Sequence, residues 1–143
     1  PDEQREIEIL RLHHRGLDPH RLADEDLSPA TTVEQVQECA AAIQRVTVED
    51  GMLSYVSSIA RETRRLPRVL LGASPRAGVA LLTCGKALAA LADREFLVPD
   101  DIKAVAIPIV AHRTLLDSSL YGVARIAEAE EAVAAVLRSV SAP

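Results

Sequence analysis

Aromatic residues make up only 2% of this 143-residue chain, and tryptophan is absent. The rings present are Tyr55, Phe96 and Tyr121. Proteins that bind single-stranded nucleic acid commonly stack bases on exposed rings, so this shortage argues against such a surface. Hydrophobic residues nevertheless make up 48% of the chain. We therefore expect a folded protein whose core is built from Leu, Val, Ile and Ala.

Cysteines and long apolar runs are also scarce. The two cysteines, Cys39 and Cys84, lie within apolar helical patterns; one disulfide is conceivable, but we expect two reduced core thiols. No apolar run approaches the roughly 18 residues of a membrane span, and there is no signal-peptide pattern. These absences predict a cytoplasmic protein without a membrane partner. The chain begins with Pro1 rather than Met, so we expect it to be one domain, residues 1–143, of a longer protein.

Positive charge is concentrated in one short segment. The formal net charge is −5, which disfavours general binding to nucleic acid. Residues 61–76 nevertheless contain five arginines and only one acidic residue, Glu62. The arginines are Arg61, Arg64, Arg65, Arg68 and Arg76. This segment is the part of the chain most suited to an anionic partner.

The apolar spacing predicts an all-α protein, a helical bundle of about five to six helices with a few very short extended pieces. Helices are expected over 2–15, after Thr32, from Thr47 to about Arg65, after Ser74, from Pro99 onward, and over 124–140. Residues 16–31 read as a polar loop, 114–123 as irregular, and 69–71, 96–98 and 114–116 as short extended pieces. Pro108 should kink its helix.

Each predicted helix carries apolar residues that we expect to face inward. They are Ile7 and Leu10; Val33, Val36, Ala40 and Ile43; Met52, Tyr55, Val56 and Ile59; Ala77, Leu81, Cys84, Leu88 and Leu91; Ile102, Val105, Ala106 and Ile109; and Ile126, Ala129, Val133, Val136, Leu137 and Val140. Two overlapping capping boxes, Thr31 or Thr32 with Glu34 or Gln35, should open the second helix.

Two patterns that suggest chemistry do not withstand inspection. The segment from Gly78 to Lys86 superficially resembles a phosphate-binding loop. However, six residues separate Gly78 from Gly85 rather than four, Ala87 stands where Ser or Thr would hold Mg²⁺, and the segment reads as helix. The histidines lack the spacing of metal ligands, so no metal site is predicted.

The informative stretch begins at Gly72 and ends at Ala77. Ser74 is a good N-cap residue and Pro75 a good first helical residue. Arg76 then occupies the first turn, where unpaired backbone N–H groups and the positive end of the helix dipole attract anions. An arginine is unfavourable for the helix at that place. It therefore suggests a phosphate that binds and leaves, although a surface arginine paired with an acid is the plainer alternative.

The segment from Thr63 to Ala77, which includes Gly72-Ala73-Ser74-Pro75-Arg76-Ala77, resembles the sensor-2 region of MoxR-family AAA+ ATPases. The segment from Phe96 to Ala106, followed by His112-Arg113, is similar to the same family, and the opening residues Pro1–Leu10 resemble its entry into the C-terminal helical domain. Val98 departs from the family's more usual Thr. The resemblance covers most of 1–113.

This resemblance implies the small helical lid of an AAA+ ATPase, without the nucleotide-binding α/β domain. Arg76 would be the sensor-2 arginine that reaches the γ-phosphate of ATP, with Ser74 and Pro75 beside it at the nucleotide. ATP and Mg²⁺ would belong to the full-length protein, with none tightly bound by this domain alone. The implied partners are the protein's own AAA+ core domain, further copies in a ring, and von Willebrand factor A-domain proteins, with chaperone-like remodelling as the outcome.

The chain alone lacks a phosphate loop and is not expected to hydrolyse ATP. The other arginines, 61 to 68, are interpreted either as helix-surface charges or as contacts to the core domain or a neighbouring subunit. Three alternatives remain for the whole chain: the lid of a related branch such as magnesium-chelatase-like ATPases, a stand-alone helical regulator that binds nucleic acid, or an adaptor without a nucleotide role.

Overall fold

The structure is a computed structural model, and it describes residues 1–17, 28–117 and 122–143. The chain divides into two compact units, Pro1–Val36 and Gln37–Pro143. In the described residues there are six α-helices and one two-stranded sheet, and 68% of the structure is helical. The predicted all-α bundle with very short extended pieces is confirmed.

Helix α1 spans Glu3–His14 and begins at Asp2, whose carboxylate accepts a hydrogen bond of 2.9 Å from the backbone N–H of Arg5. Gly16 follows the helix end with φ of +94°, a left-handed conformation that glycine adopts without strain. The predicted inward face of this helix is wrong: no residue of α1 is buried, and Leu10 is 69% exposed. The polar loop predicted over 16–31 lies mostly outside the described residues.

Helix α2 spans Val33–Arg45. Its start is a reciprocal capping box: the backbone N–H of Gln35 donates to Thr32 Oγ1 at 3.2 Å, and that of Thr32 donates to Gln35 Oε1 at 2.9 Å. The predicted box is confirmed. The predicted buried face is not, because no residue of α2 is buried and Val33 and Val36 are exposed. An apolar face is buried only where another element covers it, and in the described structure no residue of α2 is fully covered.

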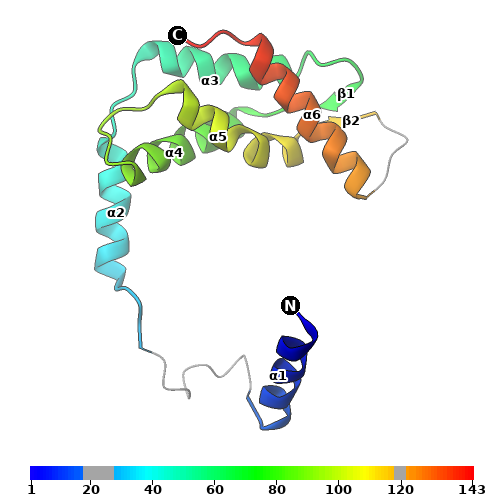
Figure 1. The fold of residues 1–143 in the computed structure, drawn as a ribbon. Coiled ribbons are helices and arrows are strands. Elements are labelled where there is room, and N and C mark those ends of the chain that lie inside the picture. Colours follow the sequence, from blue (N-terminus) through cyan, green and yellow to red (C-terminus); the bar gives the residue numbers. More distant parts are fainter. Residues whose placement is uncertain (18–27, 118–121) are drawn as a thin grey trace. The chain divides into compact units, whose positions relative to one another are not determined.

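Helices α3 (Asp50–Thr63), α4 (Pro75–Leu91), α5 (Pro99–Val110) and α6 (Val123–Ser139) enclose the core. Figure 1 shows α4 beside α5, with α3 lying over them and α6 crossing near the sheet. The strongest packing joins α4 to α5, and α6 contacts both α3 and α5. As predicted, α3 buries its apolar face, and Ile59 on that face is fully inaccessible to solvent.

The buried stripe of α4 differs from the predicted one. It consists of Ala77, Leu81, Gly85 and Ala89 at a spacing of four, whereas Leu91 is 82% exposed. The reason is the close approach of α5. A Cβ on Gly85 would lie 2.7 Å from Ile102 Cδ1 and 3.0 Å from Leu97 Cδ1. A glycine of α4 therefore faces the neighbouring helix, and Gly85, one of the two glycines in the segment that resembled a phosphate loop, allows close packing.

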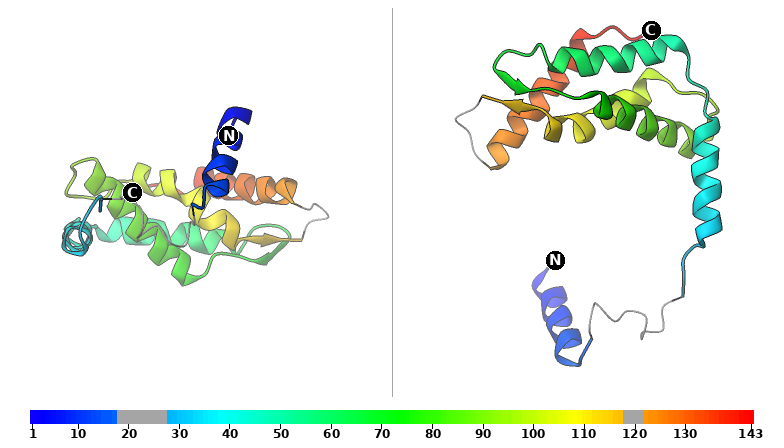
Figure 2. Two further views of the ribbon diagram at one scale, coloured as in Figure 1. Left: turned by 90° about the horizontal axis from the view of Figure 1, so that it is seen from below. Right: turned by 180° about the vertical axis from the view of Figure 1, so that it is seen from behind.

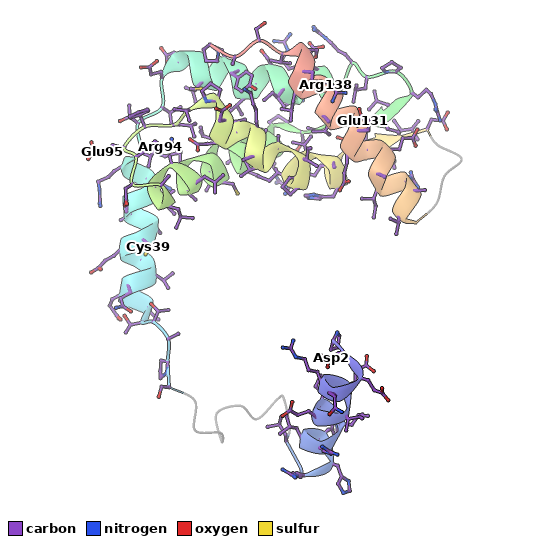
Figure 3. The ribbon with its side chains drawn as sticks, in the orientation of Figure 1. Asp2, Cys39, Arg94, Glu95, Glu131 and Arg138 are labelled. Atoms are coloured by element: carbon purple, nitrogen blue, oxygen red, sulfur yellow. The ribbon has the colours of Figure 1, made fainter. Side chains whose placement is uncertain are left out.

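The expectation of two buried thiols is wrong, because Cys39 on α2 and Cys84 on α4 are both free and exposed. Figure 3 labels Cys39 on α2. Cys84 is exposed because the buried stripe of α4 passes through Gly85 and not through the neighbouring Cys84. Helices α5 and α6 bury half of their predicted inward residues, namely Ile102, Ala106, Ala129, Val133 and Val136. Most of the others are partly buried against the core, and Ile126 is 58% exposed.

The extended pieces are short and pair in two places. Strand β1 (Val69–Leu71) is antiparallel to β2 (Leu115–Leu116), and both views in Figure 2 show these strands side by side. Thr47 and Phe96 form an isolated bridge. Helix α5 contains Pro108 and passes into the 3₁₀-helix η2 (Ala111–Arg113). Residues 118–121, within the segment predicted as irregular, lie outside the described residues. None of the described helices is long and apolar enough to cross a membrane.

Candidate functional site at the start of helix α4

The predicted site residues are brought together at the start of α4. Ser74 is the N-cap in extended conformation, Pro75 is the first helical residue, and Arg76 follows it with its side chain exposed. There is no acidic residue in the first turn. Among the described residues, no acidic side chain forms an ion pair with Arg76. This part of the chain therefore does not support the alternative that Arg76 is an ordinary surface arginine paired with an acid.

The cap itself differs from the usual arrangement. Ser74 occupies the N-cap position as predicted, but its hydroxyl forms no capping hydrogen bond within the described structure. The backbone N–H of Ala77 instead donates to the backbone oxygen of Ser74 at 2.9 Å. This tight first turn uses the N–H group that a Ser hydroxyl would otherwise accept from.

The residue that precedes Ser74 is held by the end of α3. Ala73 is fully buried, and its backbone N–H donates to Thr63 Oγ1 at 2.9 Å. The Thr63 hydroxyl in turn donates to the backbone oxygen of Ala60 at 2.7 Å. Thr63 is itself fully buried. The buried Thr63 hydroxyl therefore both donates and accepts a hydrogen bond. Loss of either bond would leave a buried polar group without a partner, so these bonds hold the backbone of Ala73 in place.

The other polar group of Ala73 is held by Arg64. The Arg64 guanidinium donates through Nη1 to the backbone oxygen of Ala73. Gly72 makes this approach possible, since a Cβ at that position would lie 2.6 Å from Arg64 Cγ and 2.7 Å from Arg64 Cα. We call these four residues, Thr63, Arg64, Gly72 and Ala73, the α3–loop contact. The sequence analysis did not predict this contact, although the adjacent small residues Gly72 and Ala73 are compatible with a close approach of two backbone segments.

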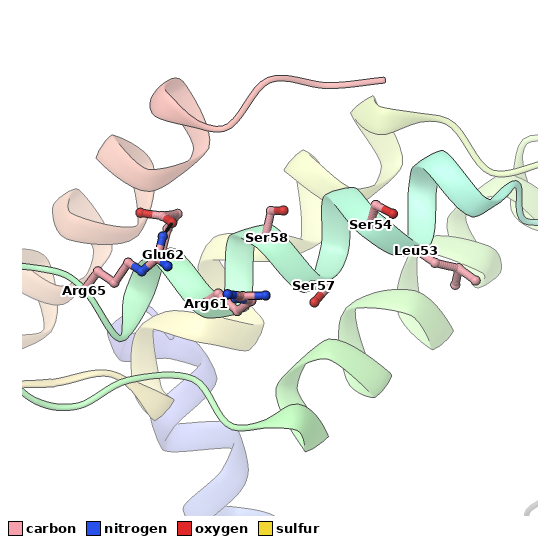
Figure 4. Close-up of a pocket in the computed structure, with 7 residues that line it drawn as sticks. All are labelled: Leu53, Ser54, Ser57, Ser58, Arg61, Glu62 and Arg65. Atoms are coloured by element: carbon pink, nitrogen blue, oxygen red, sulfur yellow. Dashed lines mark hydrogen bonds and ion pairs between the residues drawn. The ribbon is translucent and has the colours of Figure 1, made fainter.

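Two of the other arginines of the 61–76 segment have acidic partners nearby. Arg65 pairs with Glu62 at 2.6 Å on the exposed face of α3 (Figure 4). Arg68 lies 3.6 Å from Glu128 and also donates to the backbone oxygen of Asp117. These contacts favour the interpretation that Arg65 and Arg68 interact with acidic residues of this domain.

Two shallow grooves flank α3. One, of about 480 Å³, follows its outer face past Ser54, Ser58 and Arg61 (Figure 4). The other, of about 290 Å³, lies between α3 and α4 and is lined mainly by apolar residues, with Arg64 and Pro75 at its edge. Neither groove is lined by Arg76. The candidate site is therefore an exposed helix start, and a ligand seated there would leave much of its surface open to another molecule.

Helix α5 starts in a different electrostatic setting. Arg94, labelled in Figure 3, donates from Nη2 to Asp101 Oδ1 at 2.6 Å and from Nη1 to Oδ2 at 2.8 Å. Asp101 also accepts the backbone N–H of Val98 at 3.0 Å. The Arg94 hydrogen bonds hold the pKa of the Asp101 carboxyl below its ordinary value of 3.8. Asp101 thus forms one half of a capping box, in which the third helical residue accepts the N–H of the N-cap residue, whereas Val98 has no side-chain oxygen to form the other half.

In the described part of the chain, no three His, Cys, Asp or Glu side chains gather where they could hold a metal ion. His112, one of the histidines considered above, has Nδ1 2.9 Å from the backbone oxygen of Pro108. The imidazole of His112 therefore interacts with a backbone group of the preceding helical turn.

A family model described as "AAA lid domain" matches residues 61–138. The match covers the α3–loop contact, the start of α4 and helices α4 to α6. The chain belongs to the AAA lid domain family. The lid predicted from the sequence is confirmed.

Curated relatives agree with this membership. The uncharacterized protein YeaC of Bacillus subtilis is 30% identical over 145 residues, which cover 100% of this chain and 42% of YeaC. Protein MoxR of Methylorubrum extorquens is 29% identical, with coverage of 100% and 46%. Chaperone MoxR1 of Mycobacterium tuberculosis is 28% identical, with coverage of 81% and 31%. The resemblance to MoxR proteins is confirmed, and the lid spans less than half the length of these relatives.

The fold is also present in a solved structure. The crystal structure of a "putative ATPase" from Cytophaga hutchinsonii aligns with a TM-score of 0.69 at 24% identity and covers 99% of this chain and 44% of that one. The likeness confirms the fold of the lid.

Proposed function

We propose that this lid belongs to a MoxR-type AAA+ ATPase and supplies Arg76 as the sensor-2 arginine to ATP bound on the core domain of the same protein. The observation that carries the proposal is the exposed Arg76 in a first helical turn that holds no acidic residue. A guanidinium presents a planar fork of donors that suits phosphate oxygens. Its charge would be balanced by the phosphate, not by the lid.

The start of α4 fits the terminal phosphates of a nucleotide. The positive end of the helix dipole and the guanidinium of Arg76 both favour an anion at this place. Ser74 and Pro75 are proposed to line the same ligand, since the Ser74 hydroxyl forms no capping bond within the described structure. ATP would supply the phosphoryl group that is transferred, and the proposal assigns the ligands of Mg²⁺ to the core domain.

The wider assignment follows the relatives. One of them is named as a chaperone, and two carry the name MoxR. We propose that the full-length protein forms a ring of identical subunits in the cytoplasm and couples ATP hydrolysis to chaperone-like remodelling. Proteins with von Willebrand factor A-domains are proposed as its partners. The lid would close on ATP and transmit that movement through the rigid packing of α4 against α5.

The test is steady-state ATP hydrolysis by the full-length protein with Arg76→Ala and Arg76→Lys. We expect Arg76→Ala to lower turnover at least about tenfold, because an arginine finger, which stabilises the transferring phosphate from a different position, is worth about 10³–10⁵ in rate. Lysine should restore little, since a single ammonium group cannot reproduce the fork.

The matched control is Arg65→Ala, which removes an arginine of the same segment whose partner is Glu62 on the surface. Turnover should stay within about twofold of the wild type, because exposed ion pairs contribute little. Unchanged turnover in Arg76→Ala would contradict the sensor-2 role. Purified 1–143 should show no Mg²⁺-dependent ATP turnover, and such activity would contradict the assignment of catalysis to the core domain.

A further inference from the structure

Only two residues, Ser74 and Pro75, separate the buried Ala73 from the exposed Arg76, and the conformation of this short segment is restricted. Ser74 is extended, with φ of −79° and ψ of 168°. Pro75 has its φ fixed by its ring, and Arg76 lies within the first turn of α4. With so little freedom between them, the place at which Ala73 is held determines where the backbone of Arg76 lies. The α3–loop contact therefore fixes the position of the Arg76 Cα, from which the side chain extends.

Arg64 is bound differently from its neighbours in the arginine segment. Arg65 and Arg68 have carboxylate partners, whereas the guanidinium of Arg64 donates to a backbone oxygen. A charged donor bound to a neutral carbonyl forms a strong, directional hydrogen bond without neutralising the cation. Arg64 thus fixes the loop and leaves its positive charge beside the helix start that is proposed to receive phosphate.

Gly72 shows that this contact is built at close range. Its Cβ position is filled by Arg64, with Cγ at 2.6 Å and both Cα and the backbone nitrogen at 2.7 Å. The only positive-φ glycines among the described residues are Gly16 and Gly122, so Gly72 is needed here for space and not for an unusual backbone angle. The backbone of α3 and the loop before α4 touch directly, and a looser loop would not permit the Arg64 bond.

We propose that Arg64 is a positioning residue, which acts through Ala73 to set the position of Arg76 against the nucleotide. This inference rests on the proposed sensor-2 role of Arg76. It assigns to the second arginine of the segment a part in catalysis without contact to the reacting atoms. Small displacements of a group that must meet a phosphate strongly reduce the rate, and the contact with α3 prevents such displacements.

The experiment compares steady-state kinetics of the full-length ATPase carrying Arg64→Met, Arg76→Ala, both changes, Arg64→Lys and the control Arg65→Met. Methionine keeps the aliphatic stem that lies against Gly72 and removes only the guanidinium. We expect Arg64→Met to lower kcat about fivefold, with KM changed less than about twofold, because the loss of the Ala73 hydrogen bond displaces Arg76 without removing it.

The decisive measurement is the effect of Arg64→Met in the Arg76→Ala background. If Arg64 acts through Arg76, removing its guanidinium there should change kcat by less than about twofold. Arg64→Lys retains a donor for the Ala73 oxygen and should restore kcat to within about twofold of the wild type. Arg65→Met should leave kcat unchanged, because the Arg65 side chain is 64% exposed and pairs only with Glu62 among the described residues.

Other results would overturn either the positioning role of Arg64 or the sensor-2 role of Arg76. An unchanged kcat in Arg64→Met, or an equal loss in both backgrounds, overturns the positioning role and leaves the role of Arg76 intact. An Arg76→Ala variant with normal turnover overturns the proposed function itself. If Arg64→Met does not yield folded protein, Arg64→Lys decides: its kcat should lie within about twofold of the wild type, and a larger loss in a variant that keeps a cation and a donor contradicts the inference.

Discussion

Helices α4 and α5 begin with the same local sequence pattern, an extended residue followed by proline, yet their first turns have opposite electrostatic character. At α5, Asp101 accepts the Val98 N–H and forms a two-bond ion pair with Arg94. At α4, the first turn holds no acid, and Arg76 points outward without an ion-pair partner among the described residues. One helix start is completed by the chain, and the other is open to an anion.

This difference shows how a structural helix start can be distinguished from a functional one. A carboxylate at the positive end of a helix stabilises it, whereas a guanidinium in the same place does not. Arg94–Asp101 therefore serves the fold, and Arg76 is placed against the helix's own preference. Placement that costs stability is typical of groups whose partner is a ligand.

The largest effect is expected from making the start of α4 resemble that of α5, by Arg76→Glu. Turnover of the full-length ATPase should fall about 100-fold or more, because the new carboxylate repels phosphate. The stability of the lid should be unchanged or rise by up to about 0.5 kcal/mol, since the acid suits the helix dipole. ATPase rates and urea unfolding of the chain measure the two effects. A loss of stability parallel to the loss of rate would contradict the comparison.

The next effect comes from opening the start of α5, by Asp101→Ala. Asp101 is only 6% exposed, so its loss leaves Arg94 and the Val98 N–H without their partner. The free energy of unfolding should fall by about 2 kcal/mol, as measured by urea denaturation. The control is Asp100→Ala, whose side chain is 86% exposed and pairs with Lys103 on the surface. It should cost less than about 0.5 kcal/mol, and equal costs would show that the buried pair has no special role.

A smaller effect concerns pH. Hydrogen bonds from Arg94 lower the pKa of Asp101 below 3.8 in the folded chain. A carboxyl group whose pKa is lower in the folded chain stabilises the fold at pH values above its pKa in the unfolded chain. This stabilisation is lost as the pH falls through the pKa of the folded chain. The difference in unfolding free energy between the wild type and Asp101→Asn should therefore be constant near neutral pH and shrink below about pH 3.8. A difference that did not vary with pH would contradict this assignment.

The smallest effect is expected for Ser74→Ala. An N-cap serine normally contributes about 1 kcal/mol, but the Ser74 hydroxyl forms no capping bond in the described structure, so the change should cost less than about 0.5 kcal/mol. Thr63→Val is the matched comparison, because the Thr63 hydroxyl makes two buried hydrogen bonds and should be worth about 2 kcal/mol. Thermal unfolding distinguishes them, and a reversed order would contradict the described cap.

A second contrast in the molecule shows the limit of amphipathic patterns. Helices α2 and α3 both carry apolar residues at helical spacing, and the sequence predicts a buried face for each. Only α3 buries its face, and Val33 of α2 is 68% exposed. Periodicity indicates that a face favours burial, but the covering surface has to come from another element.

The sequence alone determined the helical class, the helix starts at Pro75 and Pro99, the short extended pieces and the position of Arg76 in the first turn. These features depend on local chemistry: proline restricts φ, side chains cap backbone groups, and apolar spacing follows the helical period. The family resemblance added the lid, which the comparisons confirm.

Only the tertiary structure decided which glycines and arginines do what. Gly85 lies in the buried stripe because Ile102 of α5 fills the place of its side chain, and Gly72 is required because Arg64 does the same from α3. Arg64 and Arg65 are neighbours of the same type, yet one holds the loop before α4 and the other lies on the surface. These roles depend on contacts between residues distant in the chain, which no local pattern encodes, because the same side chain fits several surroundings until packing selects one.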